Sequence, residues 1–329
     1  MDKKIDVSVI IPVYNSQSHI LRCIDSVIKQ DFSGDLEVVV IDDCSTDNSL
    51  EIIRSLAVKD ARIKVIEHSI NRKISLARKT GLKNAVGKYI WFVDSDDWIE
   101  PGSIQKLFDY SENSQCDVLL FNVNRVYPDS NKKVKYYPLP KKASSKWDLI
   151  PFFRGALWRK FIKSTVISSS FKAFDKSYMT GEDYLCSLEV LVNAQKVILD
   201  GHCYYNYYVN SNSITQSNNT KVRMLKNEDI MINGVVSILN KYQIPADFKK
   251  QELMYLRDLF LLRVASNPSH IIVAEKKLVY NNIRILNRNL VENGLKRYTL
   301  ECSSSKFYWL IQLLKRGHLR SFLSIIKSF

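Results

Sequence analysis

The sequence predicts an α/β protein in which a mostly parallel sheet is flanked by helices. Short β-branched runs without polar alternation, typical of strands buried on both faces, alternate with amphipathic segments over about the first 120 residues. Acidic clusters directly follow two of these runs, at 42–43 and 94–97, where ligands bind in parallel sheets. Helical patterns then dominate from about residue 225. We therefore expect an α/β domain over 1–215 and a basic, mainly helical region over 216–329.

The predicted elements alternate along the first part of the chain. Ser16 or Ser18 can cap the first helix. Ile20, Ile24 and Val27 recur in it at helical spacing. We expect strands at 7–13, 36–41, 63–66 and 88–93, with helices near 20–28, 46–57 and 75–84 between them.

The pattern is less regular farther along. A fifth strand is predicted at 118–121. The polar segment 127–146, which contains Lys and Pro, is expected to form a hairpin or loop over the ligand-binding edge. A helix is predicted near 183–194. The Asn-, Ser- and Tyr-rich stretch 204–220 is typical of a mobile lid or linker.

Composition excludes several classes of protein. With 329 residues, 46% hydrophobic and 25% charged, the chain is too apolar to be disordered. Its six cysteines form no C-x-x-C pair or close cluster, so neither a zinc site nor a disulfide framework is indicated, and we expect a reducing cytoplasm. No run approaches the roughly 18 to 20 continuous apolar residues of a membrane-spanning helix.

The net charge of +14 lies mainly in the second part of the chain. Residues 221–329 hold 19 Lys and Arg against 8 Asp and Glu, and no acid follows Glu301. There, basic residues alternate with aromatic and leucine residues, a pattern that predicts contact with an anionic membrane surface. A terminal helical hairpin packed on its own domain is an alternative, and the two can coexist. No nucleic-acid motif accompanies the charge, so nucleic acid is not an expected partner.

Seven motifs, in order along residues 1–215, resemble those of inverting family 2 glycosyltransferases with the GT-A fold, of the bacterial surface-polysaccharide kind. Carboxylates on one sheet edge already imply a bound cation or a donor-rich ligand, since they repel one another. Any one motif alone is weak, but together they are specific. They are Val9-Ile10-Ile11-Pro12-Val13-Tyr14-Asn15, Val40-Ile41-Asp42-Asp43-Cys44-Ser45-Thr46-Asp47, Ala77-Arg78 with Gly81, Gly87-Lys88-Tyr89-Ile90, Asp94-Ser95-Asp96-Asp97, Trp158 with Lys160, and Gly181-Glu182-Asp183.

The resemblance implies a UDP-sugar donor and a divalent metal. Asp94 and Asp96 would hold Mn²⁺ or Mg²⁺, which favour oxygen ligands and offset the charge of the diphosphate leaving group. Asp97 would orient the loop instead. Alternatives stay open: the acidic cluster can cap the next helix, Asp43 can form an Asx turn, and Tyr14 can be a core aromatic. The implied donor-binding residues are Pro12, Tyr14, Asp43, Arg78, Asp94, Ser95, Trp158 and Lys160.

The resemblance also implies the catalytic pair and the acceptor. Asp183 would be the catalytic base that takes the proton of the acceptor hydroxyl, and Glu182 would orient the acceptor. Single displacement would invert the anomeric carbon. A helix-capping role for both acids is the alternative. The implied acceptor is a glycan, linked to polyprenyl diphosphate, used for capsule, O-antigen or exopolysaccharide. The enzyme would lie in the cytoplasm at the inner face of the membrane, and a homodimer stays open.

The sequence departs from the family pattern in places. The family often has Asn-x-Gly before Ala-Arg, where this chain has Asn71-Arg72-Lys73. Some relatives add a histidine as a metal ligand, but His202 is offset from that position, which aligns with Asn206, so we expect His202 to be structural. Ser213-Ile214-Thr215 resembles a lid that closes over the diphosphate.

Three other functions compete with this interpretation. A non-catalytic nucleotide-sugar-binding or scaffold protein on the same fold is the main alternative, and the intact acids Asp94, Asp96 and Asp183 argue against it. A nicotinamide-dependent oxidoreductase would need a glycine-rich turn after the first strand, where 12–16 contains no glycine. A nucleotidyltransferase would need a glycine- and lysine-rich phosphate loop near the N-terminus, which is also missing.

Overall fold

A computed structural model of the chain describes residues 4–128, 133–136, 139–140, 143–174, 181–209 and 231–266, with the single positions 285, 288, 289 and 292. Internal contacts divide the chain into two compact units, Met1–Ser211 and Asn212–Phe329. The division lies close to the boundary predicted after residue 215. The functional roles expected for the two parts stay predictions.

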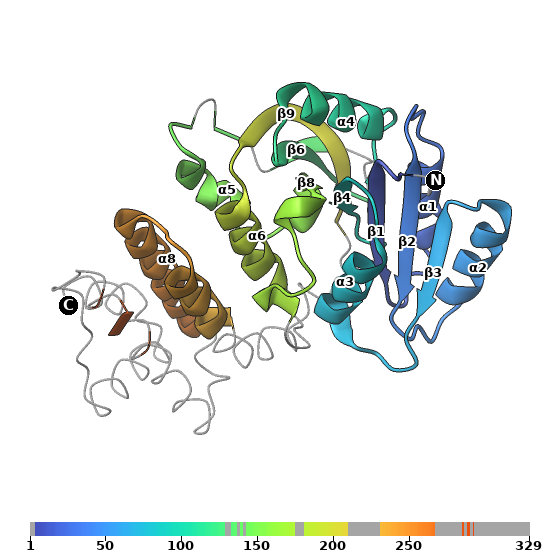
Figure 1. Cartoon of the computed structure of the whole chain (residues 1–329). Helices are drawn as coiled ribbons and strands as arrows, with labels where there is room; N and C mark the ends of the chain where they lie inside the picture. The colour runs from blue at the N-terminus through green and yellow to red at the C-terminus, as the bar shows by residue number, and fades with distance from the viewer. Residues whose placement is uncertain are drawn as a thin grey trace. The chain divides into compact units, whose positions relative to one another are not determined.

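Four parallel strands form the first half of the sheet (Figure 1). They lie in the order β3 (Ile63–Glu67), β2 (Leu36–Asp42), β1 (Val7–Val13) and β4 (Tyr89–Phe92). Every residue of β1 and of β4 is buried, as the runs without polar alternation predict. The predicted strands and the mostly parallel α/β class are confirmed for this half.

Helices cover both faces of these strands. α1 (Ile20–Ile28) and α2 (Ser49–Lys59) pack against one face, where their apolar side chains share a core cluster with Val9 and Val38. α3 (Lys73–Asn84) packs against the other face. A Cβ added at Gly81 of α3 would lie 2.3 Å from Ile10 Cγ2, so glycine allows this helix to approach the sheet closely. α4 (Ser103–Ser114) follows β5 (Trp98–Ile99) and contacts β6 (Val118–Val126).

The second half of the sheet mixes directions. β8 (Lys160–Lys163) lies antiparallel between β4 and β6 (Val118–Val126). β9 (Val197–Tyr208) runs parallel to β6, and β5 (Trp98–Ile99) pairs with its far end. In all, the described residues form a nine-stranded sheet in the order β3-β2-β1-β4-β8-β6-β9-β5, with β7 (Lys133–Tyr136) paired to β6.

Two predictions for this half are settled by the pairing. β7 (Lys133–Tyr136) lies within 127–146 and forms an antiparallel hairpin with the end of β6, whereas its predicted place over the ligand-binding edge stays a prediction. The lid or linker predicted over 204–220 is wrong for Tyr204–Tyr208, because these residues end β9 and Tyr205 is fully buried. Positions 210–220, with the lid motif at 213–215, lie outside the described residues.

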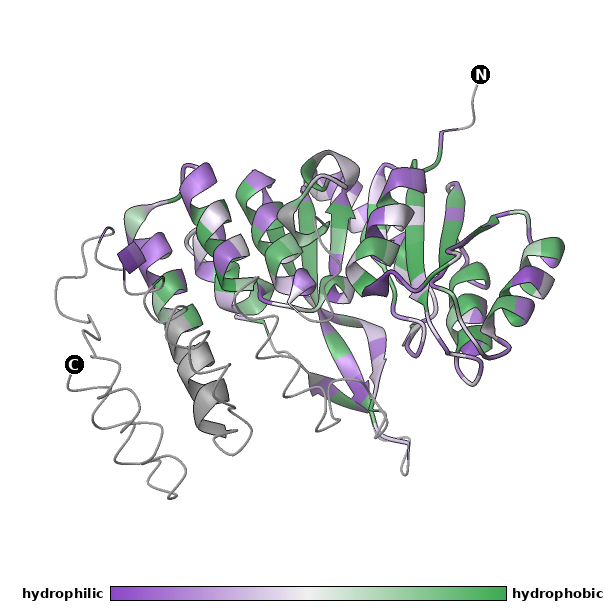
Figure 2. Cartoon of the chain, turned by 90° about the horizontal axis from the view of Figure 1, so that it is seen from below, coloured by the Kyte–Doolittle hydropathy of each residue, from purple (hydrophilic) through white to green (hydrophobic). Residues whose placement is uncertain are grey.

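Short helices connect the later strands, and one longer helix follows β8. α6 (Glu182–Asn193) begins one residue before its predicted start and buries most of its length. The short elements are η1 (Lys146–Leu149), α5 (Ile150–Phe153), η2 (Leu157–Arg159), η3 (Ser164–Val166) and η4 (Lys172–Phe174). Figure 2 shows hydrophobic colour concentrated along the strands and on one side of several helices.

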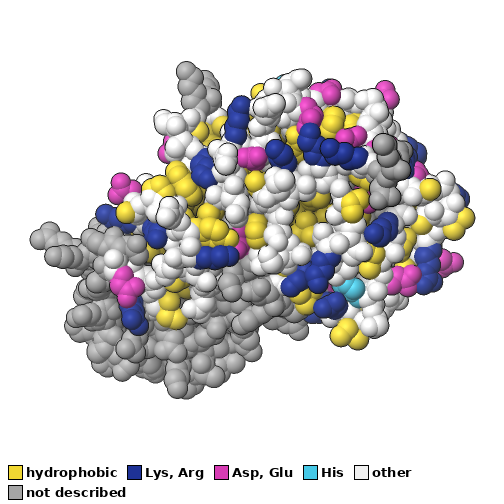
Figure 3. Space-filling view, in the orientation of Figure 1, with side chains coloured by type: hydrophobic (Ala, Val, Ile, Leu, Met, Phe, Trp, Pro, Cys, Tyr) yellow, Lys and Arg dark blue, Asp and Glu magenta, His cyan; other side chains and the backbone are white. Residues whose placement is uncertain are grey.

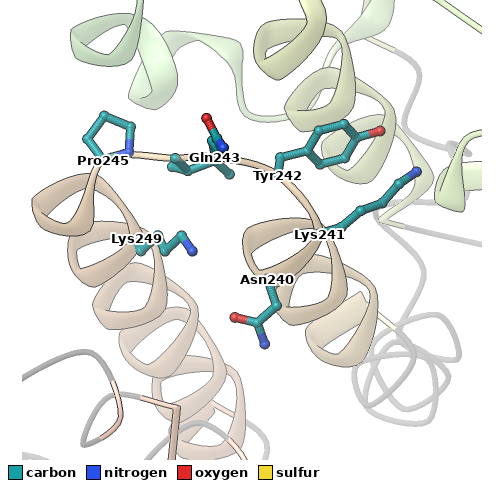
Figure 4. A pocket seen from close by; sticks show the side chains of 7 residues that line it. Asn240, Lys241, Tyr242, Gln243, Pro245 and Lys249 are labelled. Carbon is teal, nitrogen blue, oxygen red and sulfur yellow. The ribbon is translucent and has the colours of Figure 1, made fainter.

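The second unit contains helical residues 231–241 and α8 (Ala246–Ser266), in agreement with the predicted helices. The turn between them borders an open pocket of about 570 Å³ lined by Lys241, Tyr242, Lys249 and their neighbours (Figure 4). Within the described part of the chain, no helix is long and apolar enough to cross a membrane. The basic tail after Glu301 lies outside the described residues, so its predicted membrane contact stays a prediction.

Candidate functional site

The carboxyl ends of β1, β2 and β4 meet at one edge of the sheet. These strands are parallel neighbours, so the residues after them, Tyr14, Asp43 and Asp94, emerge at the same edge. A hydrogen bond of 2.6 Å between Ser16 Oγ and Ser95 Oγ joins the loops after β1 and β4. The predicted juxtaposition of the two acidic clusters is therefore present.

A buried arginine joins three carboxylates beside this edge. Arg78 Nη1 donates to Glu182 Oε1 at 2.9 Å and also to Asp183 Oδ1. Its Nη2 donates to Asp94 Oδ1 at 2.8 Å. The Arg78 side chain is only 2% exposed, whereas those of Asp94 and Asp183 are 28% and 25% exposed. Residues from α3, the end of β4 and the start of α6 thus form one cluster, which we call the Arg78 cluster.

The Arg78 cluster shifts the pKa of its acids. Burial, with the neighbouring Asp183 charge, raises the pKa of Glu182 to about 7, although Arg78 opposes the rise. Burial also raises the pKa of Asp94 to about 6, since the lowering by Arg78 offsets it only in part. Glu182 Oε2 is buried and has no hydrogen-bond partner among the described residues. Perturbed acids of this kind are typical of functional sites.

Asp96 and Asp97, in the loop after β4, have different surroundings. Asp97 is buried and accepts hydrogen bonds from the Tyr205 hydroxyl at 2.6 Å and from the Tyr208 N–H at 2.7 Å, so it orients the loop as the resemblance implies. Asp96 is half-buried, and its carboxylate forms no hydrogen bond to another residue in the described ranges. Its carbonyl oxygen accepts a hydrogen bond of 2.8 Å from Arg22 Nη2. Sequence reasoning did not find Arg22 or Tyr205, because neither belongs to a motif.

The chemistry of these residues fits a hard divalent cation. Asp94 and Asp96 offer carboxylate oxygens, and Mg²⁺ is commonly held by one or two carboxylates together with substrate phosphates. Among the residues that the structure describes, no group of three or more His, Cys, Asp and Glu side chains is placed to hold a metal. A cation held by Asp94 and Asp96 would complete its coordination with oxygens of water or of a bound phosphate.

Asp43 lies in a second network at the same edge. Its Oδ1 accepts the Arg72 N–H at 2.8 Å and lies 2.7 Å from His68 Nδ1. Its Oδ2 accepts the Lys73 N–H at 2.8 Å. The Asp43 carboxylate therefore does not form an Asx turn, which was the alternative role for it. Nothing in the sequence drew attention to His68, since it stands in a loop without a motif.

The other predicted donor-binding residues lie in different surroundings. Pro12 is buried in β1, and Tyr14 is 45% exposed, so Tyr14 is not a core aromatic. Trp158 is only 6% exposed, and its ring stacks on Tyr205 at a centroid distance of 4.8 Å.

Lys160 is fully buried; burial, with the Arg159 charge, lowers its pKa to about 7. Its Nζ donates to the carbonyl oxygens of residues 155 and 156. The structure thus places Trp158 and Lys160 in the interior.

The two positions considered for a further metal ligand also differ. His202 has a side chain that is 81% exposed, and its Nδ1 lies 2.6 Å from Asp200 Oδ1. Asn206 is fully buried, and its Oδ1 accepts a hydrogen bond from Asn124 Nδ2 at 3.1 Å. His202 thus pairs with Asp200 at the surface, and its structural role stays a prediction.

Comparison with known proteins identifies relatives of the chain. The family model described as glycosyl transferase family 2 matches residues 8–180. The uncharacterized glycosyltransferase EpsJ of Bacillus subtilis is 32% identical over 221 residues, which cover 64% of this chain and 63% of EpsJ. The poly(ribitol-phosphate) beta-N-acetylglucosaminyltransferase TarS of Staphylococcus aureus is 31% identical over 60% of this chain and 35% of TarS. The match thus spans less than two thirds of each relative.

Solved structures show the same fold. The crystal structure of S. aureus TarS 1–349 in complex with UDP-GlcNAc superposes with a TM-score of 0.70 and 21% identity, over 98% of this chain and 91% of that one. A mannosyltransferase from Pyrobaculum calidifontis, in complex with GDP-Man and Mn²⁺, superposes with a TM-score of 0.53 and 13% identity, over 99% of this chain and 84% of that one. These likenesses confirm the GT-A class expected from the sequence.

Proposed function

This chain belongs to glycosyl transferase family 2, and on that premise we propose that it transfers a sugar from a UDP-sugar to a hydroxyl group of a glycan acceptor. The observation that carries the proposal is the Arg78 cluster, which joins Asp94 at the end of β4 to Glu182 and Asp183 at the start of α6. Asp94, which would serve the leaving group, and Asp183, which would take the acceptor proton, thus both contact one arginine. The relatives, by their names, are enzymes of sugar transfer.

The donor would bind across the sheet edge. Half-exposed Tyr14 offers a ring for stacking against the nucleobase, next to Asp43 and buried Pro12. Ser95 would lie beside the diphosphate, where Asp94 and Asp96 would hold Mn²⁺ or Mg²⁺. When bound, the cation would offset the negative charge that grows on the diphosphate as the sugar bond breaks. UDP-GlcNAc, the ligand of the TarS structure, is the first donor to test.

Asp183 would act as the base in this reaction. Its Oδ1 contacts Arg78, while a quarter of the side chain stays exposed and can reach an acceptor hydroxyl. Glu182 would orient the acceptor from the buried side. Attack in a single displacement forms the new glycosidic bond as the bond to UDP breaks, so an α-linked donor gives a β-linked product.

The test measures UDP release from a panel of UDP-sugars with Mn²⁺ or Mg²⁺, and then with chelator. We expect chelator-sensitive turnover that falls by about 10²-fold or more in Asp183→Asn and in Asp96→Ala. The matched control is Asp31→Asn, an exposed acid away from the cluster, which should leave turnover unchanged. Metal-dependent UDP binding without turnover in the presence of acceptor would favour the alternative, a non-catalytic nucleotide-sugar-binding or scaffold protein.

We also propose that the acceptor is a polyprenyl-diphosphate-linked glycan and that the enzyme works at the inner face of the cell membrane. Support comes from the 19 basic and 8 acidic residues of 221–329. The full chain should float with vesicles that contain anionic lipid. Replacement of Lys306, Lys315, Arg316, Arg320 and Lys327 by glutamine should abolish flotation, and unchanged flotation would contradict this part of the proposal.

A further inference from the structure

Three donors among the described residues fix the Asp43 carboxylate, two from the loop between β3 and α3 and one from the first residue of α3. The N–H groups of Arg72 and Lys73 donate one to each oxygen, both at 2.8 Å, and His68 Nδ1 lies 2.7 Å from Oδ1. The Asp43 side chain is only 4% exposed. Its orientation is therefore set by the protein before any ligand binds.

His68 is itself held from its other side. Its Nε2 lies 2.9 Å from Thr80 Oγ1 of α3, and its side chain is 6% exposed. An ionised carboxylate only accepts hydrogen bonds, so His68 Nδ1 carries the proton that faces Asp43. In the neutral ring, Nε2 then accepts the Thr80 hydroxyl proton. The imidazole thus cannot rotate without losing both contacts.

The backbone at the start of α3 supports the same arrangement. Lys73 has φ of 70°, a left-handed conformation that is unfavourable for a residue other than glycine. The Lys73 N–H is one of the donors to Asp43. A strained residue whose amide contacts a buried carboxylate indicates that the position of this carboxylate matters for function.

The acceptor positions of the Asp43 carboxylate limit which nucleobase edge it can bind. A carboxylate has about four acceptor positions, two on each oxygen. In Asp43 the residues that the structure describes use both positions on Oδ1 and one on Oδ2, so among them no donor occupies the second position on Oδ2. The uracil edge presents a single imide N–H, which this position satisfies. Guanine presents two adjacent N–H donors that would address both oxygens, and Oδ1 is already occupied.

We propose that His68 is a positioning residue that occupies Asp43 Oδ1, leaves Oδ2 for one nucleobase N–H, and thereby makes the site select uridine over guanosine nucleotides. This inference rests on the proposed function, since it assumes that the sheet edge binds a nucleotide. His68 would touch no substrate, so its effect would appear in nucleotide affinity and preference and not in the rate of the chemical step.

The test compares His68→Asn, His68→Gln and His68→Leu in the full chain. The Asn amide nitrogen takes the place of Nδ1 and keeps the donor to Asp43, whereas Gln reaches only the Nε2 position. Binding of UDP and GDP is measured by calorimetry, and KM and kcat are measured with the best UDP-sugar. We expect His68→Asn to stay within about threefold of the original protein, while Gln and Leu lose about tenfold in UDP affinity and lower the UDP-to-GDP affinity ratio about tenfold. Their KM should rise while kcat stays within about twofold.

His202→Asn, a change at an exposed histidine, is the control and should alter none of these values. Equal losses in His68→Asn and His68→Gln would overturn the inference, as would a UDP-to-GDP ratio that no variant changes. The Asn and Gln variants decide the matter even if His68→Leu does not fold. Failure of the original protein to bind UDP at all would instead contradict the proposed function, and this inference with it.

Discussion

The Tyr205 hydroxyl lies between two parts of the loop after β4. It donates to the Asp97 carboxylate at 2.6 Å and accepts the Asp94 N–H at 3.1 Å. Tyr205 belongs to β9, whereas the loop joins β4 to β5. One buried hydroxyl thus fixes the backbone that carries Asp94 and Asp96, although its own strand is more than 100 residues away in sequence.

Removal of this hydroxyl should destabilise the fold. Tyr205→Phe leaves the buried Asp97 carboxylate and the Asp94 N–H each with one partner fewer, so we expect a loss of about 1–3 kcal/mol in the free energy of unfolding. Denaturant titration measures the loss. Tyr110→Phe, at a 43% exposed ring, is the matched control and should change stability by less than about 0.5 kcal/mol. Equal stability of the two variants would show that the Tyr205 contacts contribute nothing.

Removal of the Arg78 charge should destabilise the fold more than removal of the Tyr205 hydroxyl. Arg78→Met leaves three carboxylates, on Asp94, Glu182 and Asp183, without the cation that they share, and we expect destabilisation of about 3–5 kcal/mol. Thermal unfolding of the full chain tests this. Arg54→Met breaks an exposed pair with Glu67 and should cost no more than about 1 kcal/mol. A small effect at both positions would mean that water or counterions replace Arg78.

The buried Lys160 should make the free energy of unfolding depend on pH between neutral and alkaline values. Burial lowers its pKa to about 7 in the folded chain, from an ordinary value of about 10.5, so the unfolded chain binds more protons between these values. The free energy of unfolding should therefore rise with pH across this window, by at most about 1.4 kcal/mol per pH unit. Below pH 7 Lys160 is charged in both states, so the folded state is destabilised by the full cost of burying that charge. The measurement is unfolding free energy from pH 6.5 to 10 for the original protein and for Lys160→Met. If the difference between the two curves does not change with pH, Lys160 stays charged in the folded state.

Gly81 should not tolerate a larger side chain. The Cβ of Gly81→Ala would lie 2.3 Å from Ile10 Cγ2 and 2.9 Å from Ile41 Cδ1, so α3 must move away from the sheet. Overpacking of about 1–3 kcal/mol should outweigh the gain of up to about 1 kcal/mol in helix propensity. Differential scanning calorimetry provides the measurement, with Gly201→Ala as control because its nearest neighbour atom lies at 3.9 Å. A melting temperature raised by Gly81→Ala would contradict the prediction.

The sequence predicts the first half of the fold closely, since local patterns determine it. Residues 7–13 and 36–41 are apolar except for Ser8 and Glu37, and the structure has β1 and β2 at these positions with one residue added to β2. The second half depends on pairings between distant segments. β8 lies between β4 and β6, and Tyr204–Tyr208 pairs with β6, but no local pattern identifies such neighbours. The polar residues around these tyrosines therefore suggested a lid.

In the candidate site, too, the sequence predicted local features but not the contacts between distant segments. Motif spacing located Asp43, Asp94 and Asp183, because each follows a strand or starts a helix. It did not show that Arg78 contacts the acids rather than solvent, nor that His68 contacts Asp43, since both contacts depend on how α3 sits against the sheet. Figure 3 shows basic side chains in several separate groups on the visible face, a distribution that net charge alone does not predict.

α3 carries residues for both ends of the proposed donor site. Thr80 contacts His68, which contacts Asp43, the proposed binding group for the nucleobase, while Arg78 contacts the acids where the sugar bond would break. These two residues are only two positions apart on one helix, which has close contact with the sheet at Gly81. A shift of α3 along its axis would misalign recognition and chemistry together. Substitutions that displace this helix should therefore change KM and kcat in the same variant, even where they lie far from any bound sugar.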